Sequence, residues 1–583
     1  MRFLWPSRFL SVWQGQKYKK LVYANKTRKK LSEFGKTPAV SGEICYFCID
    51  KQHLDMLPMR LYTAGIADFE KIRQNNRVYV DKTDLIYQLT KESDFVFLGR
   101  PRRFGKSLLC STLKYYFQGR KDLFEGLAIA ELETEWKQHP VLHFDMSACK
   151  NKQNIHEIIE ELHSQIDYHE KLFNNRLKTK GSPGTRFKNL IQGLHDDTGQ
   201  KTVVILDEYD SPILDYLHKP ELLEEVRHIM QEFYQMVKIC DKDERFVFIT
   251  GITKFSQLSI FSTLNNLRNI SMLPQYAAIC GFTKEELLTV FSEDITMLAQ
   301  RYHCSDEEML DKLRLYYDGY HFCDDSTDIY NPYSLTSVFT DKKLDYYWFR
   351  SGTPTFLFEE MKRYSTNLLE LEQLNVPSSQ FDVPTEGMTS ALPLLYQSGY
   401  LTIKGYDFIR NTYTLDFPNA EVKVGFMDNF LSSMMGIQNS NSQGFASDFY
   451  FHLYNHDIES AMKAMQAFFA SIPYLEFGEK ELDDITKYEA YYEVLTYVVF
   501  SIFNCRTFTQ VKVARGKTDV VVFMRDAIYV MELKMHGSAY DALNQINSKD
   551  YAIPYQAERK PVVKIGIAFS QETKTVSEWK VVK

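Results

Sequence analysis

The sequence predicts a multidomain α/β protein, and three observations lead to this fold class. The chain has 583 residues, which is too long for one hydrophobic core. From about residue 61, short apolar runs alternate with helix-length amphipathic segments, as in a parallel sheet with crossover helices. Near the C-terminal end, consecutive strand-like runs are flanked by helices. We therefore expect a parallel sheet, a middle region and a second, C-terminal α/β domain.

Composition and charge narrow the class of protein. With 44% hydrophobic and 25% charged residues, the chain has the composition of an ordinary globular protein. Its net charge of -7 gives no overall attraction for nucleic acid, so any such contact needs a local basic surface. The longest uncharged apolar stretch, residues 494–505, is shorter than the ~20 residues that cross a bilayer. We expect no membrane association.

The nine cysteines favour a reducing, cytoplasmic location. The only close pair, Cys45 and Cys48, lacks the further ligands of a structural zinc site. Residues 1–58 form a basic N-terminal extension, in which Pro6 and Arg8 interrupt the apolar core that a signal peptide would need. A transit-like extension, or a start upstream of Met56 or Met59, is favoured over a nucleic-acid-binding arm.

The region 59–273 is expected to contain the parallel sheet. The predicted strands are Phe95–Leu98, Val141–Phe144, Val203–Leu206 and Phe246–Ile249, and the predicted helices are Ser107–Phe117, Ile155–Tyr168 and Leu222–Val237.

A phosphate-binding loop follows the first of these strands. Residues 99–107 have the sequence GRPRRFGKS and lead into a helix, so that backbone N–H groups and a positive helix end would face a phosphate. Gly105 would allow close approach, Lys106 would reach the β- and γ-phosphates, and Ser107 would hold Mg²⁺. The loop departs from the usual pattern because Arg100 occupies the position of the first glycine.

Two carboxylates follow the strand Val203–Leu206, which is the Walker B pattern. Asp207 would bind Mg²⁺ and Glu208 would act as general base toward the attacking water. At the end of the next strand, Thr250 is a candidate γ-phosphate sensor, with an ordinary polar strand end as the alternative. We expect ATP and Mg²⁺ as cofactors, bound by Arg103, Phe104, Gly105, Lys106, Ser107, Leu108, Asp207 and Thr250.

The region 274–475 is predicted to be mostly helical, like the lid that follows a nucleotide-binding core. A proline-containing interruption spans residues 377–393, and a short β segment is expected near residues 400–415.

The C-terminal domain, 476–583, contains a second group of polar residues. After a helix expected at residues 485–503, the predicted strands are 508–513, 518–524 and 527–533, with a helix at 539–547. Glu532 and Lys534 would share one face of a strand, and Asp519 on the neighbouring strand would join them. Two carboxylates and an ammonium suit metal-assisted phosphodiester hydrolysis, with Asp519 and Glu532 as metal ligands. Taken alone, however, the pattern fits a salt-bridged β-hairpin better.

Several ordered motifs resemble one bacterial family, the AAA-ATPase-like proteins that pair a P-loop domain with a C-terminal nuclease-like domain of the PD-(D/E)xK superfamily. The matching segments are Tyr79–Thr83, Arg100–Ser107, Leu206–Asp210, Thr250–Ser256, Tyr317–Tyr320, Tyr330–Ser334 and Ser351–Leu357. The resemblance implies a P-loop NTPase sheet with a helical lid, followed by an α/β restriction-endonuclease-like domain.

The resemblance also adds to the expected nuclease centre. It assigns Gln545 and Glu489 to that centre, with Glu493 competing with Glu489, while Thr518 replaces the proline of the motif. The implied function is an ATPase coupled to a Mg²⁺-dependent nuclease that acts on nucleic acid, DNA rather than RNA. The alternative is a nucleotide-gated interaction switch with an inactive nuclease fold. Acidic and basic side chains are equally numerous in residues 476–583, and the sequence leaves open whether the chain is a homo-oligomer.

Overall fold

The computed structural model describes most of the chain beyond the N-terminal extension. The described residues are 60–582 without 175–178, 218, 255–265, 326, 350–354, 385–387, 436–438, 472–493, 499–500, 502–505, 514, 525, 535, 571 and 574. The expected extension, residues 1–58, lies outside them. No helix in these described ranges is long and apolar enough to cross a membrane.

A five-stranded parallel sheet forms the first domain and confirms the α/β prediction. Its order is β2-β3-β4-β1-β5. The strands are β1 (Phe95–Gly99), β2 (Val141–Asp145), β3 (Thr202–Asp207), β4 (Glu244–Gly251) and β5 (Arg268–Asn269). The first four extend the predicted runs by a few residues at most, and β5 is additional. Every residue of β3 is buried, as expected for a parallel sheet that is covered on both faces.

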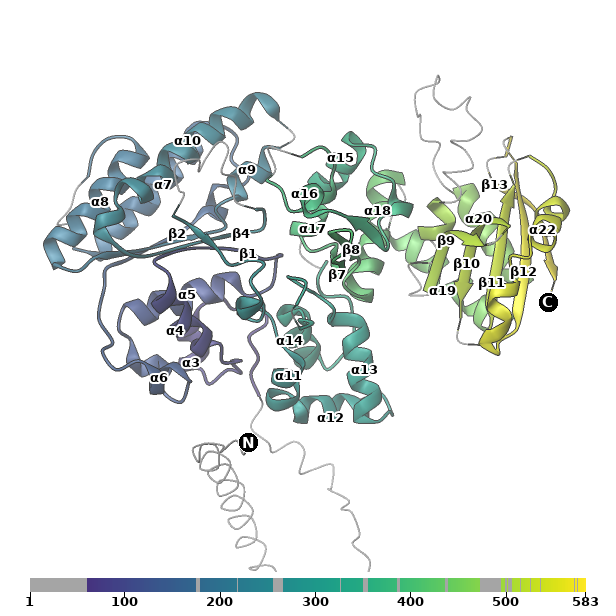
Figure 1. Ribbon diagram of the computed structural model, residues 1–583, viewed down its shortest axis with the longest axis horizontal. Coiled ribbons are helices and arrows are strands. Elements are labelled where there is room, and N and C mark those ends of the chain that lie inside the picture. Colours follow the sequence, from purple (N-terminus) through teal and green to yellow (C-terminus); the bar gives the residue numbers. More distant parts are fainter. Residues whose placement is uncertain are drawn as a thin grey trace, which may run out of the picture. The chain divides into compact units, whose positions relative to one another are not determined.

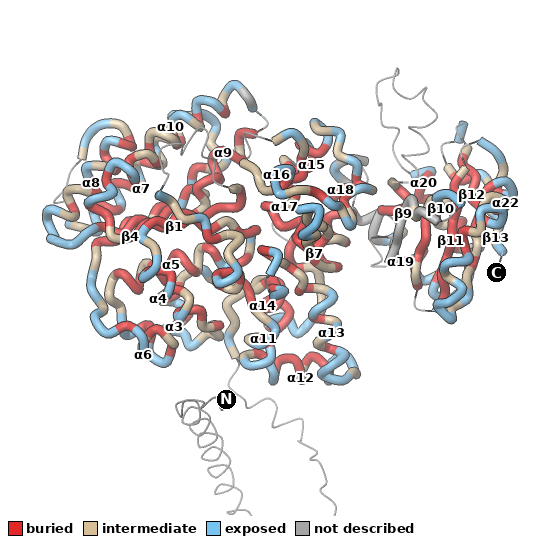
Figure 2. Tube along the Cα trace, viewed as in Figure 1, coloured by how far each residue is buried: buried red, intermediate tan, exposed pale blue. Residues whose placement is uncertain are grey.

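Helices lie on both faces of this sheet (Figure 1). On one face are α3 (Phe69–Gln74), α4 (Thr83–Glu92), α5 (Lys106–Phe117) and α6 (Ile129–Leu132), and on the other α7 (Ile155–Leu172), α8 (Pro183–Thr198), α9 (Ser211–Asp215) and α10 (Pro220–Ile239). Their ends follow local chemistry: the Ser182 side chain caps α8 and Gly199 ends it in a left-handed conformation. Figure 2 shows the strands buried between these layers.

The middle region is mostly helical, as predicted, and contains one small sheet. Four of its helices, α11 to α14, share a core that includes Phe291, Leu313 and Phe339. The helices are α11 (Lys284–Val290), α12 (Ser292–Arg301), α13 (Asp306–Tyr317), α14 (Pro332–Asp341), α15 (Thr355–Arg363), α16 (Ser378–Phe381), α17 (Leu392–Gln397), α18 (Ala420–Met435), α19 (Asn439–Tyr454) and α20 (Ile458–Ser471). The antiparallel sheet has the order β6-β8-β7, with β6 (Leu374–Val376), β7 (Thr402–Asp407) and β8 (Thr412–Asp416). The sequence predicted only its β7–β8 part.

A mixed five-stranded sheet forms the C-terminal domain, in the order β13-β12-β11-β10-β9. The strands are β9 (Arg506–Val513), β10 (Gly516–Phe523), β11 (Ile528–Lys534), β12 (Val562–Ser570) and β13 (Thr575–Val582), and helix α22 spans Ala539–Ser548. Gly566 allows α22 to lie against β12, because an added Cβ would come within 2.2 Å of the Ala539 carbonyl oxygen. Helix α20, which precedes the expected boundary at 476, packs on this sheet, where Gln466 donates to the Val576 carbonyl oxygen at 2.6 Å.

Candidate functional site

The phosphate loop has the backbone of an anion-binding turn. Between β1 and α5, Arg103 and Gly105 have φ angles of 67° and 92°. Gly105 is the N-cap residue of α5, and nothing lies within 4 Å of a Cβ built on it. Because a glycine N-cap has no side chain to bond the first N–H groups of the helix, those groups stay available to a ligand. The loop therefore keeps an open space in front of a helix N-terminus.

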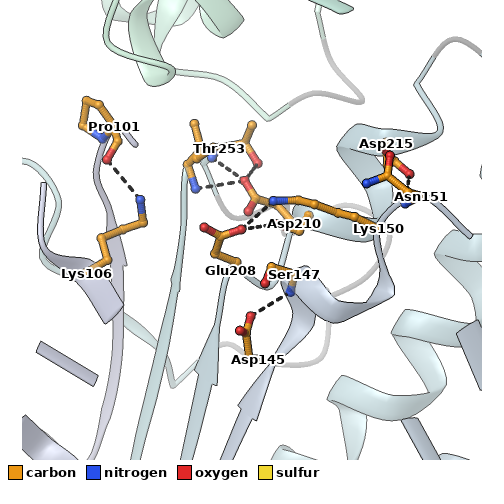
Figure 3. A network of polar contacts seen from close by, with 12 residues as sticks. Pro101, Lys106, Asp145, Ser147, Lys150, Asn151, Glu208, Asp210, Asp215 and Thr253 are labelled. Carbon is orange, nitrogen blue, oxygen red and sulfur yellow. Dashed lines mark hydrogen bonds and ion pairs between the residues drawn. The ribbon is translucent and has the colours of Figure 1, made fainter. Parts of the chain in front are cut away.

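Lys106 bends back over this loop. Its Nζ donates to the carbonyl oxygens of Arg100 at 2.9 Å and Pro101 at 3.0 Å, and the contact with Pro101 is visible in Figure 3. Arg100, at the position of the missing glycine, points away from the open space in front of α5. Its guanidinium donates to the backbone oxygens of Gly99, Ser271 and Tyr276 and lies 4.0 Å from the ring centre of Phe322. Arginine in place of the first glycine therefore does not fill the space in front of α5.

Ser107 and Asp207 come together although β1, which leads into α5, is not a neighbour of β3. Strand β4 lies between β1 and β3, but α5 crosses back so that Ser107 at its start lies close enough to the Asp207 carboxylate to lower its pKa. Burial raises the pKa of Asp207 to about 6, while Ser107 and the charge of Lys106 lower it. Its Oδ1 has no hydrogen-bond partner in the described part of the chain. A buried, unpaired carboxylate oxygen beside a hydroxyl suits a Mg²⁺ ion.

Glu208 is held by residues that the sequence analysis did not identify. It adopts a φ of 51°, and its Oε2 accepts from Lys150 Nζ at 2.6 Å and Ser211 Oγ at 2.7 Å (Figure 3). Burial alone would raise the pKa of Glu208, but the charges of Lys106 and Lys150 hold it down at about 2. Lys150 follows β2, and only the order of the strands brings it next to Glu208.

Thr250 is the last residue but one of β4. It is fully buried, and its hydroxyl donates to the Leu98 carbonyl oxygen at 2.7 Å. Its role as a phosphate sensor stays a prediction. Nearby, Asp210 Oδ2 accepts from the N–H and hydroxyl of Thr253, at 2.6 and 2.7 Å. Asp210 thereby fixes the turn that follows β4.

A cavity of about 390 Å³ opens beside the phosphate loop. Its lining includes Lys106, Ser107 and Glu208, which we call the phosphate end, and the side chains Ile66, Val78, Phe282, Pro332 and Tyr333, which we call the apolar end. The expected loop residues Arg103, Phe104, Gly105, Lys106, Ser107 and Leu108 all line it. The apolar end comes from several segments that are far apart in the sequence, so no single motif predicted it.

Two basic side chains that line the cavity, Lys82 and Arg103, contact residues of the middle region. Lys82 donates to both oxygens of Glu286 at 2.6 Å. Arg103 donates to the Tyr347 carbonyl oxygen at 2.5 Å and lies 4.1 Å from the ring centre of Tyr333. The buried Glu421, at the start of α18, accepts from the backbone N–H of Tyr347 at 2.6 Å. The phosphate loop is thus connected to α18 through a short loop.

The C-terminal domain brings its expected polar residues together. Asp519 on β10 accepts from the Leu533 N–H at 2.8 Å, and Lys534 Nζ donates to Glu532 Oε1 at 3.2 Å. Gln545 on α22 also donates to Glu532 Oε1. The Glu532 side chain is 1% exposed, and within the described ranges its Oε2 has no partner. Burial, followed by the charge of Asp519, raises the pKa of Glu532. The residues of the salt-bridged hairpin are therefore also those that the sequence analysis expected to hold a metal ion.

Tyr551 is an addition to this group, since Gln545 also donates to its hydroxyl at 3.3 Å. An added Cβ on Gly516 would lie 2.7 Å from that hydroxyl. Arg515, which directly precedes β10, pairs with Asp550 at 2.7 Å. Glu489 and its competitor Glu493 lie outside the described residues.

Comparison with known proteins identifies both domains. Residues 63–261 match the family model described as a predicted AAA-ATPase, and residues 487–579 match that of the PD-(D/E)XK nuclease superfamily. An uncharacterized protein in the vnfD 5′ region of Azotobacter chroococcum mcd 1 is 32% identical over 523 residues, which is 88% of this chain and 97% of that protein.

Proposed function

The chain belongs to the family of predicted AAA-ATPases and carries a C-terminal PD-(D/E)XK nuclease-superfamily domain, and from this premise we propose that it hydrolyses ATP to control a Mg²⁺-dependent nuclease. The substrate of the second centre would be nucleic acid, DNA rather than RNA. One observation carries the ATPase part: Lys106, Ser107, Asp207 and Glu208 converge although they come from two separate segments of the chain.

These side chains would divide the work on a triphosphate. Lys106 would exchange two loop carbonyl oxygens for phosphate oxygens, which are better acceptors because they are charged. Ser107 and Asp207 would hold Mg²⁺. The ion would neutralise the developing charge on the β- and γ-phosphates. Glu208 is ionised at neutral pH and would accept the proton of the attacking water once Lys150 releases it.

The apolar end of the cavity favours adenine. Its side chains are aliphatic or aromatic and suit the faces of a purine. Among the described residues that line the cavity, Glu208 at the phosphate end is the only acidic one. Guanine would place two N–H donors at the apolar end, where none of the described lining residues has a carboxylate to accept them.

At the second centre, Asp519 and Glu532 would hold the metal ion. Lys534 would orient the attacking water, and Gln545 would hold the Glu532 side chain in place. Mg²⁺ there would polarise the phosphodiester and lower the pKa of bound water. The buried Glu532 Oε2 supports this assignment, because a carboxylate oxygen without a partner is costly unless a ligand occupies it.

The test uses the purified full chain with labelled single- and double-stranded DNA and RNA, Mg²⁺ or Mn²⁺, with and without ATP. We expect metal-dependent cleavage of DNA that responds to ATP and disappears in Asp519→Ala and Lys534→Ala. Lys549→Ala, an exposed lysine at the end of α22, is the matched control. Unchanged cleavage in both centre variants would exclude this centre.

One observation favours the alternative, a nucleotide-gated interaction switch. Lys534 and Arg515 are both engaged by carboxylates of their own domain, which leaves less positive charge for a phosphate backbone. If no substrate is cut under any metal condition while ATP still binds, the switch is the better description.

A further inference from the structure

Beneath the proposed Mg²⁺ position lies a second set of potential metal ligands. Cys110 is on α5, one turn beyond Ser107, and His143 is on β2. In the parallel register His143 pairs with Ile205, and Ile205 shares a strand face with Asp207. His143 and Asp207 therefore point to the same side of the sheet, toward α5.

The three donor groups are close enough for one ion. The Cys110 sulfur, a ring nitrogen of His143 and a carboxylate oxygen of Asp207 all lie within 4.8 Å of one another. In a tetrahedral zinc site, ligand atoms are roughly 3.5 Å apart, given bond lengths of about 2.0–2.3 Å. Side-chain movements of about 1 Å would be sufficient.

One atom in each of two of these groups also lacks a hydrogen-bond partner. Within the described residues, neither the buried His143 Nε2 nor the buried Asp207 Oδ1 has a partner. Buried polar atoms are normally paired, so two unpaired atoms on one small cluster indicate that a ligand completes it. A sulfur, a nitrogen and an oxygen donor form a softer set than the hydroxyl and carboxylate that suit Mg²⁺.

We propose that Cys110, His143 and Asp207 form a site for Zn²⁺ or another thiophilic divalent cation, with water as the fourth ligand. Binding releases the thiol proton of Cys110 to solvent. Since the ion takes the carboxylate that would hold Mg²⁺, it excludes the Mg²⁺-nucleotide and inhibits the ATPase. The inhibition part rests on the proposed function, whereas metal binding does not.

Binding is tested first, without nucleotide, in the full chain with Cys45→Ser and Cys48→Ser as background. Titration with Co²⁺ should give one equivalent of tetrahedral ion with a thiolate charge-transfer band. Cys110→Ser should abolish the band, and His143→Gln should weaken binding at least tenfold. Cys149→Ser, which changes another buried cysteine, is the control and should leave the band unchanged.

A band that persists in Cys110→Ser, or no band in the background protein, would overturn the proposal. X-ray absorption of the zinc-loaded background protein needs no further variant and guards against misfolding of Cys110→Ser. One sulfur neighbour is expected, and a shell of nitrogen and oxygen alone would also overturn it.

Inhibition is tested separately. The zinc concentration that halves ATP hydrolysis, measured against each protein's own zinc-free rate, should rise at least tenfold in Cys110→Ala. Equal sensitivity would reject inhibition through this site. Absence of ATP hydrolysis in the background protein would instead reject the proposed function and leave the cobalt result standing.

Discussion

The two proposed centres, at the phosphate loop and in the C-terminal domain, both contain lysine and two carboxylates but differ in what the lysines contact. At the phosphate loop, Lys106 donates to two backbone oxygens, and the second lysine, Lys150, pairs with Glu208. In the C-terminal domain a single lysine, Lys534, pairs directly with the proposed metal ligand Glu532. At the phosphate loop, the charge of Lys106 is therefore not paired with a carboxylate in these contacts and can bind an anion. In the C-terminal domain, the charge of Glu532 is neutralised by Lys534 or by a proton, which a cation would have to displace.

The largest effect that would test this comparison is expected for Glu208→Gln. The amide keeps the shape of the side chain but cannot accept a proton, so ATP hydrolysis should fall by about 10²–10⁴-fold. Nucleotide affinity should change little. Steady-state hydrolysis and calorimetry on the same samples separate the two effects, and hydrolysis at the unsubstituted rate would remove Glu208 as the base.

Lys106→Ala should weaken nucleotide binding by about 100-fold, because two charge-assisted hydrogen bonds to phosphate are worth about 3 kcal/mol or more together. Calorimetric titration with ATP measures the loss. Lys137→Ala, an exposed lysine paired only with Glu135, is the control. Undiminished affinity of the Lys106 variant would contradict the assignment of the loop.

The pH dependence should distinguish the centres. Burial raises the pKa of a proposed metal ligand in each centre, that of Asp207 to about 6 and that of Glu532 further above its usual range. At a pH below the pKa of its carboxylate ligand, a metal ion must displace a proton to bind. The affinity for the metal ion therefore falls by up to about tenfold for each pH unit below that pKa. Between about pH 8 and about pH 6, Mn²⁺ binding to the C-terminal centre should weaken, while Mg²⁺-dependent nucleotide binding stays nearly constant. The reverse order, measured by calorimetry, would contradict the comparison.

The smallest effect is expected for Lys150→Met. Loss of its charge raises the pKa of Glu208 from about 2, so the acidic limb of the rate profile for ATP hydrolysis should move to higher pH. A profile with an unmoved acidic limb would show that Lys150 does not control this base. Lys152→Met, whose lysine pairs with Glu161, is the neighbouring control.

Much of the fold was predictable because it depends on local patterns. The apolar runs before Gly99 and Asp207 are strands, and the GKS sequence begins α5 as expected. The observed sheets and the family matches confirm the two α/β domains. The site residues stay predictions, although the structure brings Ser107 to Asp207 and Asp519 to Glu532.

The rest depends on contacts between distant segments. Neither the position of β4 between β1 and β3 nor the approach of Lys150 to Glu208 has a local signal. A strand pattern also could not show that the Thr250 hydroxyl donates to the Leu98 carbonyl oxygen of the neighbouring strand. The apolar end of the cavity likewise needs the fold to bring Ile66 to Tyr333.

Two hydrogen bonds connect the phosphate loop to helix α18. Arg103 donates to the Tyr347 carbonyl oxygen, and the N–H of the same Tyr347 donates to Glu421 in the first turn of α18. Under the proposed function, a displacement of Arg103 on nucleotide binding would therefore have to break the first bond or move the Tyr347 backbone. In the second case the position of α18 would depend on the nucleotide bound more than two hydrogen bonds away.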